Sequence, residues 1–364
     1  MTSLSRKLVM ALVIGAFALS GCCFQHQPES AKTTDTPARK IETVSVDNYI
    51  VTGPSTITFD AIPRKVIVVG LEESEMALAF CPKENILALY GYYDLKDFVK
   101  PQYKKRLEEI QILSRGEINV ENIMIMQPDL IIAEQCSFIP SSLRSTALWN
   151  SRGIKTYVPV NTNNPSKHLV EESIEAEYQY ISDFGKIFDK EILANDFIKD
   201  AKATLSFFKS RKNNFPASTV LIVEQFGKDI ASYDKTKLGG KIVTELGGRI
   251  PETAPLISKE DLRVLDPDVL FVVCSDGDHG ECLKRFVATP FAKQLSAVQH
   301  DRIYSIELET IYAPGLRIKD GIERIGLSLY PELRKEYWKT QKDTINPSYE
   351  SWLIRQKDRT TTPK

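Results

Sequence analysis

Two groups of residues in this chain have types and spacings suited to binding chemistry. The first is Tyr90-Gly91-Tyr92-Tyr93, whose rings can pack against a flat ligand while their hydroxyls form hydrogen bonds; ordinary packing at a strand end is the alternative. The second is Cys274 and Cys282, which could close a small disulfide loop in an oxidising compartment. With His279 between them the thiols could instead bind a metal, but the tight Cys-x-x-Cys spacing of zinc sites is missing.

Catalytic chemistry has no comparable support in the sequence. The chain contains no Gly-x-Ser-x-Gly elbow, phosphate-binding loop or His-Glu-x-x-His sequence. It has 4 histidines, and they are scattered from His26 to His300. We therefore predict a binding protein with no catalytic residues, no cofactor and no resident metal. A binder of bare metal ions is an alternative, against which the scattered histidines argue.

The first residues carry the pattern of an export signal. Arg6 and Lys7 precede an apolar run of about 12 residues, which is too short to span a bilayer as a helix and fits a signal peptide over residues 1–21. Leu19-Ser20-Gly21-Cys22 is similar to a bacterial lipobox, which implies lipidation of the Cys22 thiol. Residues 22–54 are polar and are predicted to be a flexible tether, because such a composition buries too little apolar surface to fold. The protein is therefore expected outside the cytoplasm, with its lipid anchor in a bilayer.

The composition of the remaining chain is that of an ordinary globular protein. The formal net charge is −1, which gives no electrostatic reason to expect a nucleic-acid partner. Hydrophobic residues make up 42% of the chain, and its length after the tether suits two lobes better than one small core.

An internal repeat supports two similar lobes. The segment 119–132 predicts a capped helix, a Pro-Asp turn and a buried strand, and the segment 258–271 repeats the same pattern. Asn119 and Ser258 are good N-caps, and each helix is then stopped at its Pro-Asp pair. Two matching units this far apart in the chain predict two α/β lobes.

Apolar runs between helical stretches predict mostly parallel central sheets in both lobes. The expected strands are 65–69, 86–90, 130–133, 155–159, 219–224, 269–273 and 302–306. Between the two halves, apolar residues recur at helical spacing, which predicts one long connecting helix and a ligand cleft between the lobes. The predicted parts are an N-terminal lobe (55–165), a linking helix (166–214), a C-terminal lobe (215–340) and a tail (341–364).

The order and spacing of these segments resemble a known family. This family comprises the substrate-binding lipoproteins of bacterial ABC importers for ferric siderophores, haem and cobalamin. The matching segments are 62–68, 121–132, 246–248, 258–270, 295–304 and 314–332. The resemblance implies a monomeric protein that captures a small metal chelate and delivers it to an ABC permease and its ATPase. A two-lobed extracytoplasmic sensor is the remaining alternative.

The resemblance also assigns roles to particular residues. In that family a glutamate of each lobe contacts arginines of the permease, and the matching positions are Glu121 and Glu260. From the residues alone, each glutamate could simply complement its helix dipole, which is worth about 0.3–1 kcal/mol.

The ends of parallel strands normally line such a cleft, which, with the resemblance, gives a set of candidate ligand-binding residues. They are Glu73, Tyr92, Tyr93, Phe138, Phe226, Tyr233, Glu309, Tyr312 and Arg317. Arg317 could pair with an anionic chelate, although Leu316 stands where the family usually has proline. The mixed charge of the set suits a neutral or cationic chelate at least as well as an anionic siderophore.

Overall fold

Four short strands form the sheet of the N-terminal half, and the first three along the chain are apolar. The computed structural model describes residues 40–50, 53–92, 94–162, 171–227, 229–274 and 279–341. The four strands are all parallel and lie in the order β4-β3-β5-β6. Their bounds are β3 (Val66–Val69), β4 (Ile86–Tyr90), β5 (Leu130–Ala133) and β6 (Lys155–Tyr157). The predicted strands of this half are therefore confirmed. The unbroken apolar runs of β3, β4 and β5 are those of strands buried on both faces.

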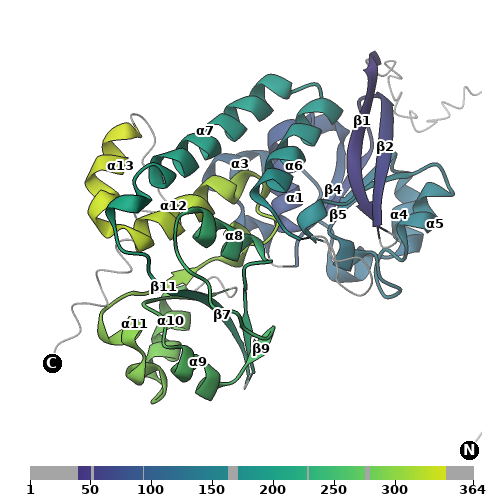
Figure 1. The fold of residues 1–364 in the computed structure, drawn as a ribbon. Helices are drawn as coiled ribbons and strands as arrows, with labels where there is room; N and C mark the ends of the chain where they lie inside the picture. Colours follow the sequence, from purple (N-terminus) through teal and green to yellow (C-terminus); the bar gives the residue numbers. More distant parts are fainter. Residues whose placement is uncertain are drawn as a thin grey trace, which may run out of the picture. The chain divides into compact units, whose positions relative to one another are not determined.

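Helices cover both faces of this sheet (Figure 1). Ile67 and Ile131 face a cluster that includes Ile123 and Trp149, whereas Val66 faces a second cluster. The helices of this half are α1 (Leu71–Phe80), α2 (Leu95–Phe98), α3 (Pro101–Leu107), α4 (Val120–Met126) and α5 (Thr146–Asn150). This arrangement brings the carboxyl ends of β3, β4 and β5 to one edge of the sheet, where the candidate ligand-binding residues follow them.

The C-terminal half has a five-stranded sheet in the order β11-β10-β7-β8-β9. The strands are β7 (Val220–Phe226), β8 (Asp229–Ser232), β9 (Leu256–Ile257), β10 (Val269–Val273) and β11 (Ile303–Ile306). The predicted strands β7, β10 and β11 are parallel, while β8 and β9, which the sequence did not indicate, are antiparallel. The helices are α8 (Leu238–Glu245), α9 (Lys259–Leu265), α10 (His279–Ala288), α11 (Ser296–Gln299), α12 (Ile318–Leu329) and α13 (Arg334–Thr340).

The internal repeat is present in the structure down to its hydrogen bonds. The side chain of Asn119 caps α4, and that of Ser258 caps α9. Gln127 (φ 49°) and Asp266 (φ 36°) end the two helices in the same left-handed conformation. At the following aspartates, the Asp129 carboxylate accepts a bond from the backbone N–H of Lys65 (3.0 Å), and that of Asp268 accepts one from Thr219 (2.7 Å).

The connector between the halves is two helices, so the expected single helix was wrong. Helices α6 (Ile174–Ile187) and α7 (Glu191–Lys209) are separated by a turn in which Asp189 adopts φ 56°. Gly185 permits the close packing of the two helices, because a Cβ there would lie 2.7 Å from the Cβ of Ala194. An aspartate tolerates the left-handed conformation better than most residues, and this signal was overlooked.

The predicted tether is also too long. Residues 40–50 form strand β1 (Lys40–Ile50), which pairs with β2 (Gly53–Ala61) in an antiparallel hairpin. Val46 and Phe59 are buried, and the Asn48 amide donates to the carbonyl of Thr156 in β6 (2.9 Å). A strand that alternates polar and apolar residues has a polar average composition, which explains the error. The predicted signal peptide, Cys22 and residues 342–364 of the predicted tail lie outside the described residues.

The largest hydrophobic cluster is shared by the two halves. It contains Val66 and Val68 of β3, Phe184 of α6, Phe208 of α7 and Phe271 of β10. Helix α12 contributes a further set of buried side chains, Ile318, Ile322, Ile325, Leu327 and Leu329. The two sheets are therefore held by one continuous core rather than by a flexible hinge. In the described part of the chain, no helix is both long and apolar enough to cross a membrane.

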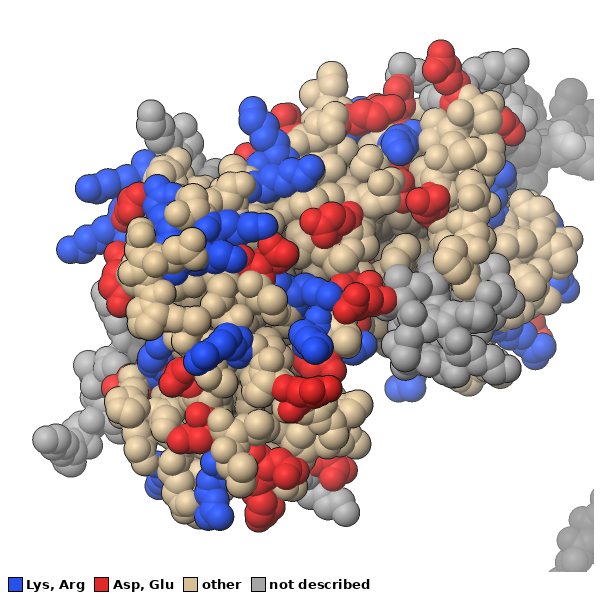
Figure 2. Space-filling view, viewed as in Figure 1, with Lys and Arg blue, Asp and Glu red and all other residues tan. Residues whose placement is uncertain are grey.

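Basic and acidic side chains are mixed over the face shown in Figure 2. Lys and Arg side chains gather over α7 and α13, where Arg211 pairs with Glu336 (2.6 Å). At least one of these basic side chains is therefore paired, and acidic side chains are interspersed over the rest of this face.

Glu323 of α12 allows a test of how burial affects stability. It is 2% exposed and accepts a hydrogen bond from the Tyr337 hydroxyl of α13 (3.0 Å). Burial, and then the charge of Asp320, raise the pKa of Glu323 from 4.5 to about 7. Between these values the folded protein holds a proton that the unfolded chain releases. The stabilisation that protonated Glu323 contributes is therefore complete below pH 4.5, and it is lost as the pH rises from there through about 7.

Glu323→Gln keeps an oxygen acceptor for Tyr337 but cannot ionise. Between pH 5 and pH 8, we expect the free energy of unfolding to fall by about 2 kcal/mol more in the wild type than in the variant. Urea denaturation at both pH values measures this difference. The exposed Glu252→Gln is the control and should follow the wild type. Equal pH dependence of the wild type and Glu323→Gln would contradict the prediction.

Candidate ligand-binding site

Three carboxylates meet at the carboxyl edge of the N-terminal sheet. Glu72 and Glu73 begin α1 directly after β3, and Glu134 directly follows β5. One carboxylate oxygen of each lies within 4.8 Å of those of the other two. Gly70, at φ 133°, has no side chain to clash with the Glu73 carboxylate, against which a Cβ would collide. We call Glu72, Glu73 and Glu134 the carboxylate cluster.

Burial raises the pKa values of the carboxylate cluster. Glu72 is 8% exposed and Glu73 is 0% exposed. Burial, followed by the charge of Glu134, raises the pKa of both Glu72 and Glu73 well above the ordinary range. The pKa of Glu134 is also raised by burial. The cluster therefore holds protons more tightly than exposed carboxylates do, unless a positive charge is supplied.

Polar groups that follow β4 and β5 surround the cluster. The Cys136 thiol donates to the Glu134 carboxylate (3.1 Å), and Tyr92 shares a hydrogen bond with the Ser137 hydroxyl (2.6 Å). Tyr92 is 52% exposed, and its ring meets that of Tyr90 edge-on with centroids 5.5 Å apart. Of the other predicted residues here, Phe138 is buried in the core beside Trp149, and Tyr93 lies outside the described residues.

Residues of the C-terminal half approach the same cluster. Burial raises the pKa of Tyr312, and the charges of Glu134 and Cys136 raise it further. Because both of these residues belong to the N-terminal half, the Tyr312 hydroxyl lies within electrostatic range of that half. Glu309 is 5% exposed, and it is among the charges that raise the pKa of Glu72. The structure thus brings Glu73, Tyr92, Glu309 and Tyr312 into one region.

Two further predicted residues lie toward the C-terminal sheet. The Tyr233 hydroxyl donates to the Glu224 carboxylate (2.6 Å), which is one of the charges that raise the pKa of Glu309. Phe226 ends β7 and is 56% exposed. Close by in the chain, Lys237 pairs with the buried Glu172 (2.9 Å), which also caps α8 by accepting from the N–H of Leu238 (2.8 Å).

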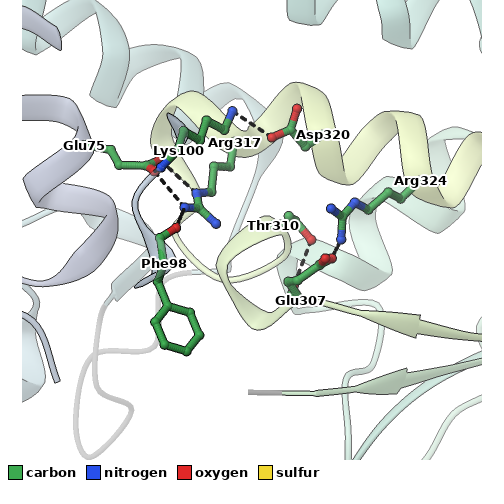
Figure 3. A network of polar contacts seen from close by, with 8 residues as sticks. All are labelled: Glu75, Phe98, Lys100, Glu307, Thr310, Arg317, Asp320 and Arg324. Atoms are coloured by element: carbon green, nitrogen blue, oxygen red, sulfur yellow. Dashed lines mark hydrogen bonds and ion pairs between the residues drawn. The ribbon is translucent and has the colours of Figure 1, made fainter. Parts of the chain in front are cut away.

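Arg317 has a different partner from the anionic ligand that the sequence suggested. Its guanidinium makes two bonds to the Glu75 carboxylate, from Nε (2.8 Å) and Nη2 (2.7 Å), and one to the Phe98 carbonyl (2.6 Å). Figure 3 shows this pair beside the Lys100–Asp320 ion pair (2.7 Å), which joins the same two regions. Arg317 is 8% exposed, so its charge is committed to joining α1 to the start of α12. The cross-lobe pair was missed because Glu75 is distant from Arg317 in the sequence.

Of the two alternatives for Cys274 and Cys282, a disulfide or a metal site, the structure contains the disulfide. Cys274 and Cys282 are joined in the structure with their Cα atoms 6.0 Å apart. Their sulfur atoms are therefore not free to bind a metal in this state. Cys81 and Cys136 are free thiols among the described residues.

A surface feature on each half repeats with the same spacing. Glu121 and Glu260 are exposed in the first turns of α4 and α9. One turn further on, Ile125 is 79% exposed and Val264 is 81% exposed. Each helix therefore presents a carboxylate beside an apolar side chain. Sequence reasoning missed the apolar members, although the repeat alignment pairs them.

The periplasmic binding protein family matches residues 93–309 of this chain. The chain belongs to the periplasmic binding protein family. This binding protein is 20% identical to the ABC transporter substrate-binding lipoprotein YvrC of Bacillus subtilis, over 90% of this chain and 97% of YvrC. It is 21% identical to the Fe(3+)-citrate-binding protein YfmC of the same organism, over 85% of this chain and 92% of YfmC.

Solved structures support the same fold. A periplasmic binding protein from Veillonella parvula superposes with a TM-score of 0.74 and 24% identity, covering 82% of this chain and 95% of that one. The family match and this structure together confirm the resemblance to substrate-binding proteins of ABC importers, the first at the level of family and the second at the level of fold. The binding protein is a substrate-binding component of an ABC importer, related to binders of ferric chelates.

The buried Arg317–Glu75 pair of this binding protein yields a stability prediction. Arg317→Met leaves the Glu75 carboxylate buried without its partner, and we expect a loss of about 3–4 kcal/mol in unfolding free energy. The double variant Glu75→Met/Arg317→Met removes both charges and should recover most of that loss. Urea denaturation of the single and double variants measures the coupling between them.

The control is Lys241→Met, which breaks the more exposed pair with Glu171 and should cost less than about 1 kcal/mol. If the Arg317 and Glu75 substitutions were simply additive, the pair would not be coupled as described.

Proposed function

We propose that this binding protein captures a metal chelate between its two halves and delivers it to its permease. The observation that carries the proposal is the convergence of Glu73, Tyr92, Glu309 and Tyr312 at the carboxyl ends of the strands. Ligands of open α/β sheets bind at that edge. The name of its relative YfmC, an Fe(3+)-citrate-binding protein, supports a chelate as cargo.

The side chains of this region limit the range of chelates that could be the cargo. The exposed ring of Tyr92 offers an aromatic face, and the surrounding carboxylates disfavour a strongly anionic ligand. Arg317, which could have offset that charge, is already paired with Glu75. Cobalamin, haem and ferric siderophores remain the candidate classes, with neutral or cationic chelates favoured over anionic ones.

Delivery would use the repeated helices. In this proposal Glu121 and Glu260 contact arginines of the permease, one from each half, and Ile125 and Val264 pack beside them. A charged pair with an apolar neighbour is desolvated on contact, which strengthens the ion pair. The shared hydrophobic core supports only small movements between the halves, so the two glutamates keep a fixed separation during docking. A lipid on Cys22 would hold the protein at the membrane outside the cytoplasm.

The cargo can be tested by fluorescence. Haem, cobalamin and a panel of ferric siderophores are titrated into the purified protein, and tryptophan and tyrosine emission is recorded. We expect saturable quenching by one chelate at micromolar concentration or below, weakened at least tenfold by Tyr92→Ala. Ile192→Ala, which removes an exposed apolar side chain of α7, is the control and should bind the chelate as the wild type does. Absence of quenching by every chelate would argue against this cargo class.

Docking can be tested separately from cargo binding. Glu121→Lys/Glu260→Lys should reduce uptake of the cargo by cells at least tenfold, because like charges would then face the permease arginines. Cargo affinity of the purified variant should stay unchanged. Ile125→Ser/Val264→Ser should reduce uptake less, and Glu252→Lys is the control. Normal uptake with both glutamates reversed would contradict the docking role.

A further inference from the structure

Glu73 is a buried carboxylate without a partner. The residue is 0% exposed, and both of its carboxylate oxygens lack a hydrogen-bond partner among the described residues. Buried polar atoms are nearly always paired, because leaving one unpaired costs free energy. The contrast with Glu75, two residues later on α1, is direct: Glu75 is equally buried and has two bonds to Arg317.

Other polar atoms around the cluster are also unpaired. The Tyr180 hydroxyl is buried and has no partner among the described residues. After burial, the charge of Glu73 is the largest cause of the raised pKa of Tyr180, which places this hydroxyl beside the cluster. The side-chain oxygen of Gln135, next to Glu134 in the chain, is likewise buried and unpaired. Carboxylate, amide and phenol oxygens are all ligand atoms suited to a hard cation.

The positive charges near the cluster have other partners. Arg317 is bonded to Glu75 and to the Phe98 carbonyl, and Lys237 is bonded to Glu172. Among the described residues, neither of these side chains donates a hydrogen bond to the Glu73 oxygens. A charge from outside the chain would satisfy the Glu73 oxygens and relieve the repulsion among the three carboxylates.

We propose that Glu72, Glu73 and Glu134 form a binding site for a hard di- or trivalent metal ion. The spacing of their oxygens, within 4.8 Å of one another, suits a single ion that all three contact. Oxygen ligands favour ions such as Ca²⁺, Mn²⁺ and Fe³⁺ over soft metals. This assignment departs from the sequence-based expectation of no metal, which relied on the scarcity of histidine. It rests on the proposed function and sharpens it: a chelate held here would present a metal with open coordination positions.

The first test uses the metal alone. Tb³⁺ is titrated into the purified full-length protein, with excitation of tyrosine, because charges of the cluster act on Tyr92, Tyr180 and Tyr312, which makes these rings the natural sensitisers of its emission. We expect saturation at one equivalent, with Mn²⁺ or Ca²⁺ competing. Glu73→Gln, Glu72→Gln and Glu134→Gln should each weaken Tb³⁺ binding at least tenfold. Glu252→Gln, on the exposed surface, should bind as the wild type does.

Thermal unfolding separates a ligand role from a structural one. Glu73→Gln replaces a buried ionisable group by a neutral one of similar size, so this variant should melt at or above the wild-type temperature without metal, yet lose the increase that Mn²⁺ gives the wild type. A variant that is merely misfolded would melt lower. Tb³⁺ binding that is unchanged in Glu73→Gln, or no saturable binding by the wild type, would overturn the proposal.

A second arm distinguishes the free ion from a chelated one. A 1:1 ferric acetohydroxamate complex, which is cationic and leaves coordination positions open, is compared with a siderophore that fills all six positions of the iron. Preference for the acetohydroxamate complex, lost in Glu73→Gln, supports the metal site within the proposed function. Binding of a saturated chelate that is unaffected by Glu73→Gln would overturn the metal site and leave chelate capture standing. Binding of metal alone, with no chelate bound, would support the metal site and overturn chelate capture.

Discussion

One hydrophobic core, shared by both sheets, is the constraint on which the rest of this structure depends. Strands β3 and β10 belong to different halves, yet Val66 and Phe271 bury their side chains in the same cluster, with α6, α7 and α12 between them. Separating the halves would expose that cluster to water, which costs roughly 25 cal/mol per Å² of apolar surface. Packing of the core, rather than a bound ligand, therefore fixes the positions of Glu73, Glu134 and Tyr312 relative to one another.

Two buried glutamates of α1 differ in whether they have an ion-pair partner. Glu75 is neutralised by Arg317 from the other half of the chain, so it contributes to cohesion. Glu73 has no such partner, and the structure bears the cost of its burial. Residues kept in an unfavourable environment by their surroundings are frequently those that act on a ligand. With the proposed metal site, α1 would carry a structural role at Glu75 and a ligand-binding role at Glu73.

Much of this fold was predictable because its strands are continuous apolar runs and its two halves repeat one capped-helix pattern. The errors have local physical causes: the turn at Asp189 interrupts what reads as one helix, and the hairpin of β1 and β2 alternates polar with apolar residues. The candidate site was predictable only where the strand-end rule applied. That rule found Glu73 and would also have found Glu134. The partner of Arg317 could not be found, because no local pattern connects residue 317 to residue 75.

The repeat of α4 and α9 has a consequence for symmetry. Each helix offers a glutamate and, one turn later, an exposed β-branched side chain, so the two halves present nearly the same face twice. A partner with exact twofold symmetry would accept this protein in either of two orientations related by a half-turn. A partner made of two unlike subunits would distinguish the two orientations at positions where the helices differ, such as Met124 and its counterpart Arg263. The shared glutamates would not distinguish them.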